Sequence, residues 1–217
     1  MHMLFIVTMP MALGALAVIC LCLYKGEICP GQRGRLHKWL PLICVPLAFS
    51  AVHTLTALIP LGLLIGFCLQ VKTGKTRNEG PRTWLLASLV TGAVIWLFEV
   101  KSMPLSLAFI SLFSFPLMGC ALAHFILVSA KSRLQAFHRI LPVTGVIATM
   151  LMLIALLGYW SSLSDTQLIV SNVLVSLVTL IFAALIWVFH VFRATAPNRW
   201  QLLSVMSLLL FALLMQH

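Results

Sequence analysis

The sequence predicts an all-α fold, a polytopic bundle of transmembrane helices that forms a single integral membrane domain over residues 1–217. Three observations lead to this class. Of the 217 residues, 62% are hydrophobic and 8% are charged, and the mean hydropathy is +1.11. A soluble domain of this size could not cover so much apolar surface with a polar exterior. Apolar runs of helical length alternate with short basic segments, which is typical of helices that each satisfy their own backbone hydrogen bonds in lipid.

The apolar stretch 39–71 determines the predicted topology. As one helix it would reach roughly 50 Å, which exceeds a hydrocarbon core about 30 Å thick. Lys and Arg crowd both of its flanks, and segments rich in these residues stay on the cytoplasmic side. We therefore expect a helical hairpin with arms at about 39–54 and 57–71. Its tip, from His53 to Thr56, would lie near the outer face.

The other spans follow from the same alternation. We expect helices at 4–24, 83–100, 105–129, 140–160, 168–191 and 200–216. The first run lacks the cationic start and cleavage site of a signal peptide, so we expect it to remain as a mature helix. The result is eight membrane-crossing segments with both termini outside. Every Lys and Arg except Lys101 then lies inside, including Lys75 and Arg77. Tryptophans near the span ends predict interfacial aromatic belts.

Charge and cysteine content exclude several classes of protein. The formal charge is +10, but the basic residues sit in short loops between spans rather than in one soluble patch, so we expect no nucleic-acid binding. Those loops are placed to contact anionic lipid headgroups. Most of the six cysteines lie inside spans, where cysteine acts as a small hydrophobe. We expect free thiols and no metal site.

Four stretches resemble one known family in collinear order. The first, LFIVTMPMALGALAVICLCLYKGE, resembles the first helix and exit of the membrane anchor subunit of bacterial dimethyl sulfoxide reductase. The others are GPRTWLLASLVTGAVIWLFEVKSM, FSFPLMGCALAHFILVSA and RILPVTGVIATMLMLIAL. Members of that family have eight helices with both ends outside. The resemblance implies a multi-pass protein of the bacterial inner membrane that anchors an oxidoreductase complex without catalysing the terminal reaction itself.

The resemblance also implies a substrate and partners. Anchors of this family oxidise menaquinol near the outer face and pass its electrons to an iron–sulfur, ferredoxin-like subunit. That subunit feeds a catalytic subunit that contains molybdopterin. Menaquinol is thus the expected substrate, the iron–sulfur clusters and molybdopterin are expected only in partner chains, and no haem is expected in this chain.

His53 falls where the family has a histidine of its quinol site. An imidazole with a pKa near neutrality suits the acceptor of a quinol proton, and we expect Thr54 and Thr56 to help bind the quinol. The family continues from this histidine into a glycine-proline turn, whereas this chain runs directly into TLTALIPLG. The family also has an acid near the quinol, and the hairpin has none. Glu99 is therefore the candidate proton exit, provided that its helix packs beside the hairpin tip.

Three other functions remain open from the sequence. His124 and His190 lie at similar depth and could ligate haem axially, which would make the protein a haem-b quinol-oxidising subunit. Pro60 and the hairpin fit a small secondary transporter, although intramembrane charge is nearly absent. A scaffold or assembly factor without a ligand is the third possibility. His37 and His138 are predicted to be loop residues.

Overall fold

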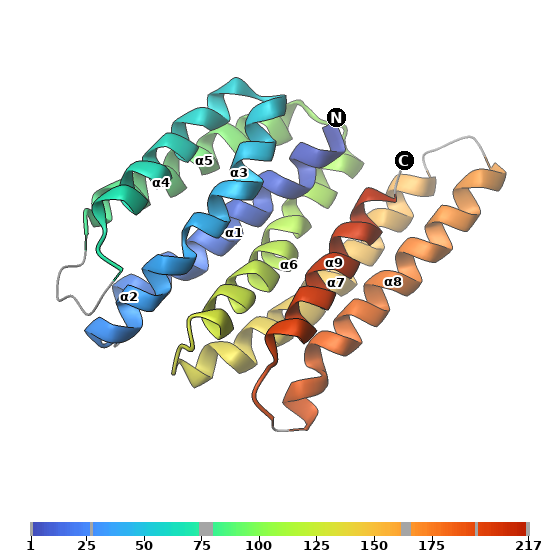
Figure 1. The fold of residues 1–217 in the computed structure, drawn as a ribbon. Coiled ribbons are helices and arrows are strands. Elements are labelled where there is room, and N and C mark those ends of the chain that lie inside the picture. Colours follow the sequence, from blue (N-terminus) through green and yellow to red (C-terminus); the bar gives the residue numbers. More distant parts are fainter. Residues whose placement is uncertain (1, 27, 74–79, 162–165, 194, 216–217) are drawn as a thin grey trace.

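The computed structural model describes residues 2–26, 28–73, 80–161, 166–193 and 195–215. In this part of the chain all regular structure is helical, as predicted (Figure 1). Lys75 and Arg77 lie outside the described residues. The elements in chain order are α1 (His2–Lys25), α2 (Pro30–Trp39), α3 (Pro41–His53), the 3-10 turn η1 (Leu55–Ala57), α4 (Leu58–Gln70), α5 (Arg82–Ser102), α6 (Leu105–Ser129), α7 (Gln135–Ser161), α8 (Thr166–Phe192) and α9 (Arg199–Leu214).

The chain reverses direction between α3 and α4, which confirms the predicted hairpin. Thr54 leaves α3 with an extended backbone (φ −129°, ψ 108°), and η1 then turns the chain into α4. Successive long helices alternate in direction, so α1 begins and α9 ends at the end of the bundle that holds this reversal (Figure 1). We call this the hairpin end. The opposite, basic end is where four helices finish beside Lys25, Lys72, Lys131 and Arg193.

Residues 30–39 form a helix, whereas the sequence predicted a loop there. Pro30 occupies the start of α2, where its missing N–H costs no hydrogen bond. The Arg35 Nε donates to the Ala130 carbonyl at 2.9 Å, which holds α2 against the end of α6. The first hairpin arm is therefore longer than the predicted 39–54, because the helical segment Pro30–His53 has 24 residues. His37 lies in α2 and is buried, not in a loop.

Six helical segments of the described residues are long and apolar enough to cross a membrane: Leu4–Lys25, Pro30–His53, Arg82–Ser102, Leu105–Ser129, Gln135–Ser161 and Ser171–Phe192. Two apolar helical segments, Leu55–Gln70 and Arg199–Leu214, are shorter. At 1.5 Å per residue these two reach about 24 Å, less than a hydrocarbon core about 30 Å thick. All eight predicted crossing segments are thus helical, and two of them are short.

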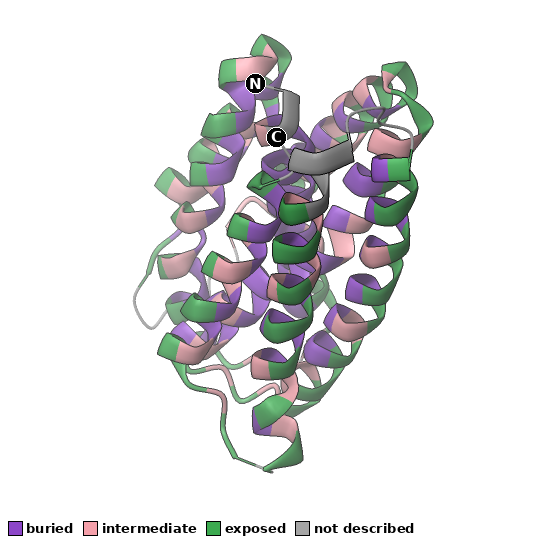
Figure 2. Cartoon of the chain, turned by 90° about the vertical axis from the view of Figure 1, so that its right-hand side faces the viewer, coloured by how far each residue is buried: buried purple, intermediate pink, exposed green. Residues whose placement is uncertain are grey.

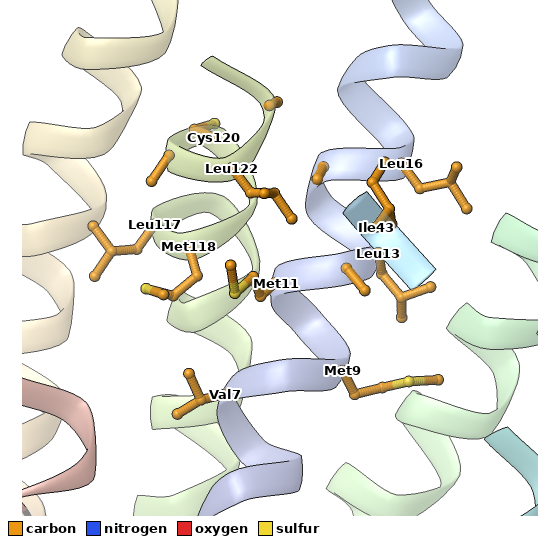
Figure 3. Close-up of a cluster of buried hydrophobic side chains, with 14 of the residues drawn as sticks. Val7, Met9, Met11, Leu13, Leu16, Ile43, Leu117, Met118, Cys120 and Leu122 are labelled. Carbon is orange, nitrogen blue, oxygen red and sulfur yellow. The ribbon is translucent and has the colours of Figure 1, made fainter. Parts of the chain in front are cut away.

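The core of the bundle lies where α1 crosses α6. Apolar side chains of both helices meet there, with Ile43 of α3 beside them (Figure 3). The two backbones come close because glycine faces glycine: a Cβ added to Gly119 would lie 2.5 Å from the Gly14 Cα. Small residues permit such close approach between helices in lipid.

Exposed apolar side chains cover the outer faces of the other helices. Figure 2 shows exposed residues along the outward faces of the helices and buried residues turned inward. Residues such as Ile154, Val178 and Phe98 are more than half exposed although they are large and apolar. A surface of this kind matches contact with lipid.

Candidate functional site

The hairpin tip places His53 against α1. His53 is the last residue of α3 and is half-buried. Its ring lies against Phe5 of α1, with 5.3 Å between the ring centroids and 49° between the planes. Phe5 is fully buried, so one face of the imidazole is held against the apolar core. Such a position restricts the ring and shields one side of it from solvent.

Glu99 lies beside this tip, which meets the condition that its predicted role requires. The Thr54 hydroxyl donates to Glu99 Oε1 across a long contact of 3.5 Å, and Glu99 is half-buried on α5. Three of the predicted site residues, His53, Thr54 and Glu99, are thus brought to one place from α3, the turn after it and α5. The site combines an imidazole, a hydroxyl and a carboxylate at the edge of an apolar bundle.

Thr56 does not join them. It is exposed on η1, and no hydrogen bond connects its side chain to the other three among the described residues. Lys101 follows Glu99 by two residues and is exposed. The tip can therefore present an ionisable acceptor and a nearby carboxylate to a small polar group that approaches from lipid or from the aqueous boundary.

A second polar cluster lies in the opposite half of the bundle. His124 of α6 is fully buried, and its ring centroid is 5.4 Å from those of both His138 and His190. The Trp187 Nε1 donates to His124 Nδ1 at 3.0 Å, and His124 Nε2 lies 3.2 Å from His138 Nδ1. In the described chain no group of three or more His, Cys, Asp or Glu is arranged to hold a metal ion.

Hydrogen-bond partners determine how these rings carry their protons. An indole N–H can only donate, so His124 Nδ1 accepts, and a neutral His124 then carries its proton on Nε2. That proton is donated to His138 Nδ1, which leaves His138 Nε2 to donate to the Ser132 carbonyl at 3.4 Å. One directional chain of hydrogen bonds thus runs from Trp187 toward the basic end. Both ring nitrogens of His124 are used, so ligation of haem iron by this residue would break one of these bonds.

The sequence predicted that His124 and His190 lie at similar depth, and their ring centroids are 5.4 Å apart. The sequence prediction did not include His138 and Trp187 in this cluster, for two reasons. It ended the preceding loop at residue 139, whereas α7 begins at Gln135 and carries His138 in its first turn. It also expected the tryptophans near the span ends, which include Trp187, to form interfacial belts, whereas the Trp187 side chain is fully buried and Gly145 of α7 provides the space for its ring. Trp96 and Trp160 are buried as well, although Trp200 is exposed as predicted. The sequence signal that could have indicated the buried position of Trp187 is Gly145, a glycine at similar depth on a neighbouring helix.

The fold and its apolar outer surface define a multi-pass integral membrane protein of helical class. A protein family described as an integral membrane domain matches residues 4–216, and the chain belongs to this family.

The chain is also similar to an uncharacterized protein of Haemophilus influenzae. The two are 36% identical over 141 residues, which cover 58% of this chain and 52% of the relative. The chain thus matches about half the length of this curated relative. No solved structure matches the sequence.

Proposed function

We propose that the protein is a quinol-oxidising membrane anchor subunit of a respiratory oxidoreductase of the dimethyl sulfoxide reductase type, in the bacterial inner membrane. The observation that carries the proposal is the meeting of His53, Thr54 and Glu99 at the hairpin tip. Such a site suits a lipid-soluble substrate that must give up protons. The substrate can reach it along the apolar surface of the bundle, and the imidazole and carboxylate there can accept protons. The proposed topology places this tip and both termini outside.

The proposed reaction releases two protons and two electrons from menaquinol and leaves menaquinone. His53 accepts the proton of one quinol hydroxyl. Thr54 orients Glu99, which takes this proton from His53 and releases it to the outer aqueous phase, and the second quinol proton then follows the same route through His53 and Glu99. The electrons leave for an iron–sulfur cluster of a partner subunit, and terminal reduction occurs on a molybdopterin-containing partner. This chain supplies binding, orientation and attachment.

Replacement of His53 tests the quinol site. For His53→Leu we expect about tenfold weaker binding of menaquinone-4, because one hydrogen bond to the ring oxygen, worth about 1.4 kcal/mol, is lost. His53→Gln keeps hydrogen-bonding capacity but cannot titrate, so binding should fall less while quinol oxidation in the assembled complex stops. Displacement of labelled menaquinone-4 from detergent-purified protein measures the first quantity.

The matched control is Lys101→Gln, which changes the hairpin end without touching the three site residues. It should bind like the unaltered protein. If His53→Leu and the unaltered protein bound menaquinone-4 with equal affinity, the result would contradict a quinol site at His53. Substrate flux in proteoliposomes without quinone binding would favour the transporter, and a haem absorption spectrum would favour the haem-b subunit. Recovery of an iron–sulfur subunit by co-purification in mild detergent tests the anchor role.

Labelling from each side of the membrane tests the proposed topology. In a cysteine-free background, Thr56→Cys should react with a membrane-impermeant maleimide added outside, because Thr56 is exposed on the tip. Ser132→Cys, in the turn after α6, should react only when the inner face is opened. If Thr56→Cys were labelled only from the inside, the true topology would be the reverse of the proposed one, and protons could not be released outside.

A further inference from the structure

A cleft opens at the basic end, far from the hairpin tip. Its volume is about 1210 Å³, and it lies between the turn after α6, the start of α7 and the segment that follows α8. The lining combines basic, polar and apolar side chains, among them Lys131, Arg133, Arg139, His138, His190 and Val191. It belongs to neither the proposed quinol site nor the core between α1 and α6.

The electrostatics of the cleft favour an anion. Lys131, Arg133 and Arg139 all line it, and each is exposed. Glu99 is the only carboxylate among the described residues, and it lies at the hairpin end. Gln135 and Ala136 bring the first turn of α7 to the cleft, and the N-terminus of a 27-residue helix adds positive potential.

His190 adds a buried polar atom without a partner. Its side chain is 4% exposed and lines the cleft. Nε2 lies 3.3 Å from the His138 carbonyl, which can only accept, so Nε2 carries the proton. Nδ1 is then an acceptor, and it has no hydrogen-bond partner in the described part of the chain. Buried polar atoms are nearly always satisfied, so a donor is expected here from outside the described part of the chain.

The surroundings of the cleft favour an amphiphile over a soluble anion. Val128, Val191 and Pro197 contribute apolar lining beside the cationic groups. Ile140 is 55% exposed on α7 and Phe192 is 82% exposed at the end of α8, close in sequence to lining residues. An acyl chain could follow these side chains while a charged headgroup occupies the cleft. Basic pockets between transmembrane helices bind anionic headgroups in this way.

We propose that this cleft binds an anionic phospholipid whose headgroup carries both a phosphate and a hydroxyl, such as phosphatidylglycerol. Lys131, Arg133 and Arg139 bind the phosphate, and the headgroup hydroxyl donates to His190 Nδ1. Binding involves no covalent step and is independent of quinol oxidation at the opposite end.

Two double variants with equal charge loss test the site. Arg133→Gln/Arg139→Gln removes two lining cations, whereas Arg193→Gln/Arg199→Gln removes two exposed cations at the same end that do not line the cleft. Delipidated full-length protein is titrated with phosphatidylglycerol and followed by native mass spectrometry. The first pair should raise the apparent Kd at least about tenfold, given roughly 1 kcal/mol per basic residue near a headgroup. The second pair should change it less than threefold.

Further arms test the headgroup and the hydroxyl. Phosphatidylcholine should bind much more weakly, and His190→Phe should reduce the preference for phosphatidylglycerol over phosphatidic acid, which lacks the glycerol hydroxyl. An equal loss in both double variants would mean diffuse attraction to the basic end and would overturn the site. Displacement of the lipid by millimolar inorganic phosphate would overturn the lipid assignment in favour of a soluble phosphate ligand.

Discussion

Gly119→Leu is expected to abolish recovery of folded protein. A Cβ at this position would lie 2.5 Å from the Gly14 Cα and 3.0 Å from the Ala15 amide nitrogen, and neither backbone atom can move as a side chain can. Inserting a leucine would push α1 and α6 apart along the core shown in Figure 3. Overpacking typically costs about 1–3 kcal/mol and occasionally more, and here the obstructing atoms belong to the backbone. Size-exclusion chromatography of a fluorescent fusion in detergent measures the monodisperse fraction, which should fall at least about tenfold.

Gly62→Leu is the matched control for this experiment. Gly62 lies on α4, and a Cβ there would meet nothing within 4 Å. The same substitution should therefore leave yield and thermal midpoint nearly unchanged. A monodisperse Gly119→Leu protein with the midpoint of the unaltered chain would show that α1 and α6 do not cross at these glycines.

The second large effect is expected at the buried contact between Trp187 and His124. Trp187→Phe leaves His124 Nδ1 without its donor, and His124→Leu leaves both the indole N–H and His138 Nδ1 without partners. Each unsatisfied buried group costs about 1–3 kcal/mol. At about 2–4 °C per kcal/mol for a chain of this size, each single variant should lower the thermal midpoint by several degrees.

A double-mutant cycle separates this hydrogen bond from packing. His124→Leu/Trp187→Phe removes donor and acceptor together, so its loss of stability should be smaller than the sum of the single losses by about 1 kcal/mol. Trp160→Phe is the matched control, because Trp160 is also buried but makes no hydrogen bond to a histidine. Strict additivity of the two single variants would mean that the indole and the imidazole do not interact.

The charge pattern predicted the path of the chain because membrane topology follows from the order of basic segments and apolar runs along the sequence. Basic flanks on both sides of 39–71 required a reversal, and the structure places that reversal at residues 54–57. The pattern could not set the ends of helices in polar segments, because a helix continues through basic residues wherever its backbone hydrogen bonds are kept. Pro30–Trp39 and the first turn of α7 are the two places where this happened.

The candidate site was predictable in parts and not as a cluster. His53 was placed at the tip by the hairpin, and Glu99 was placed at the right end by its position in a span. The hydrogen bond from Thr54 to Glu99 depends on how α5 packs beside α4 and η1, which no periodicity in one sequence reports. The contact of His124, His138, Trp187 and His190 joins three helices, and Gly145 on α7 is the residue that leaves space for it.

The order of synthesis gives the crossing of α1 and α6 a consequence for biogenesis. The ribosome delivers α1 first, but its main partner is complete roughly 5–20 s later at ordinary elongation rates. During that interval α1 lies in the bilayer without α6, where its mean hydropathy of 2.5 favours insertion and α3 covers another part of its surface. Nascent chains that stall before residue 105 would therefore leave the face of α1 that packs on α6 uncovered and exposed to quality-control proteases.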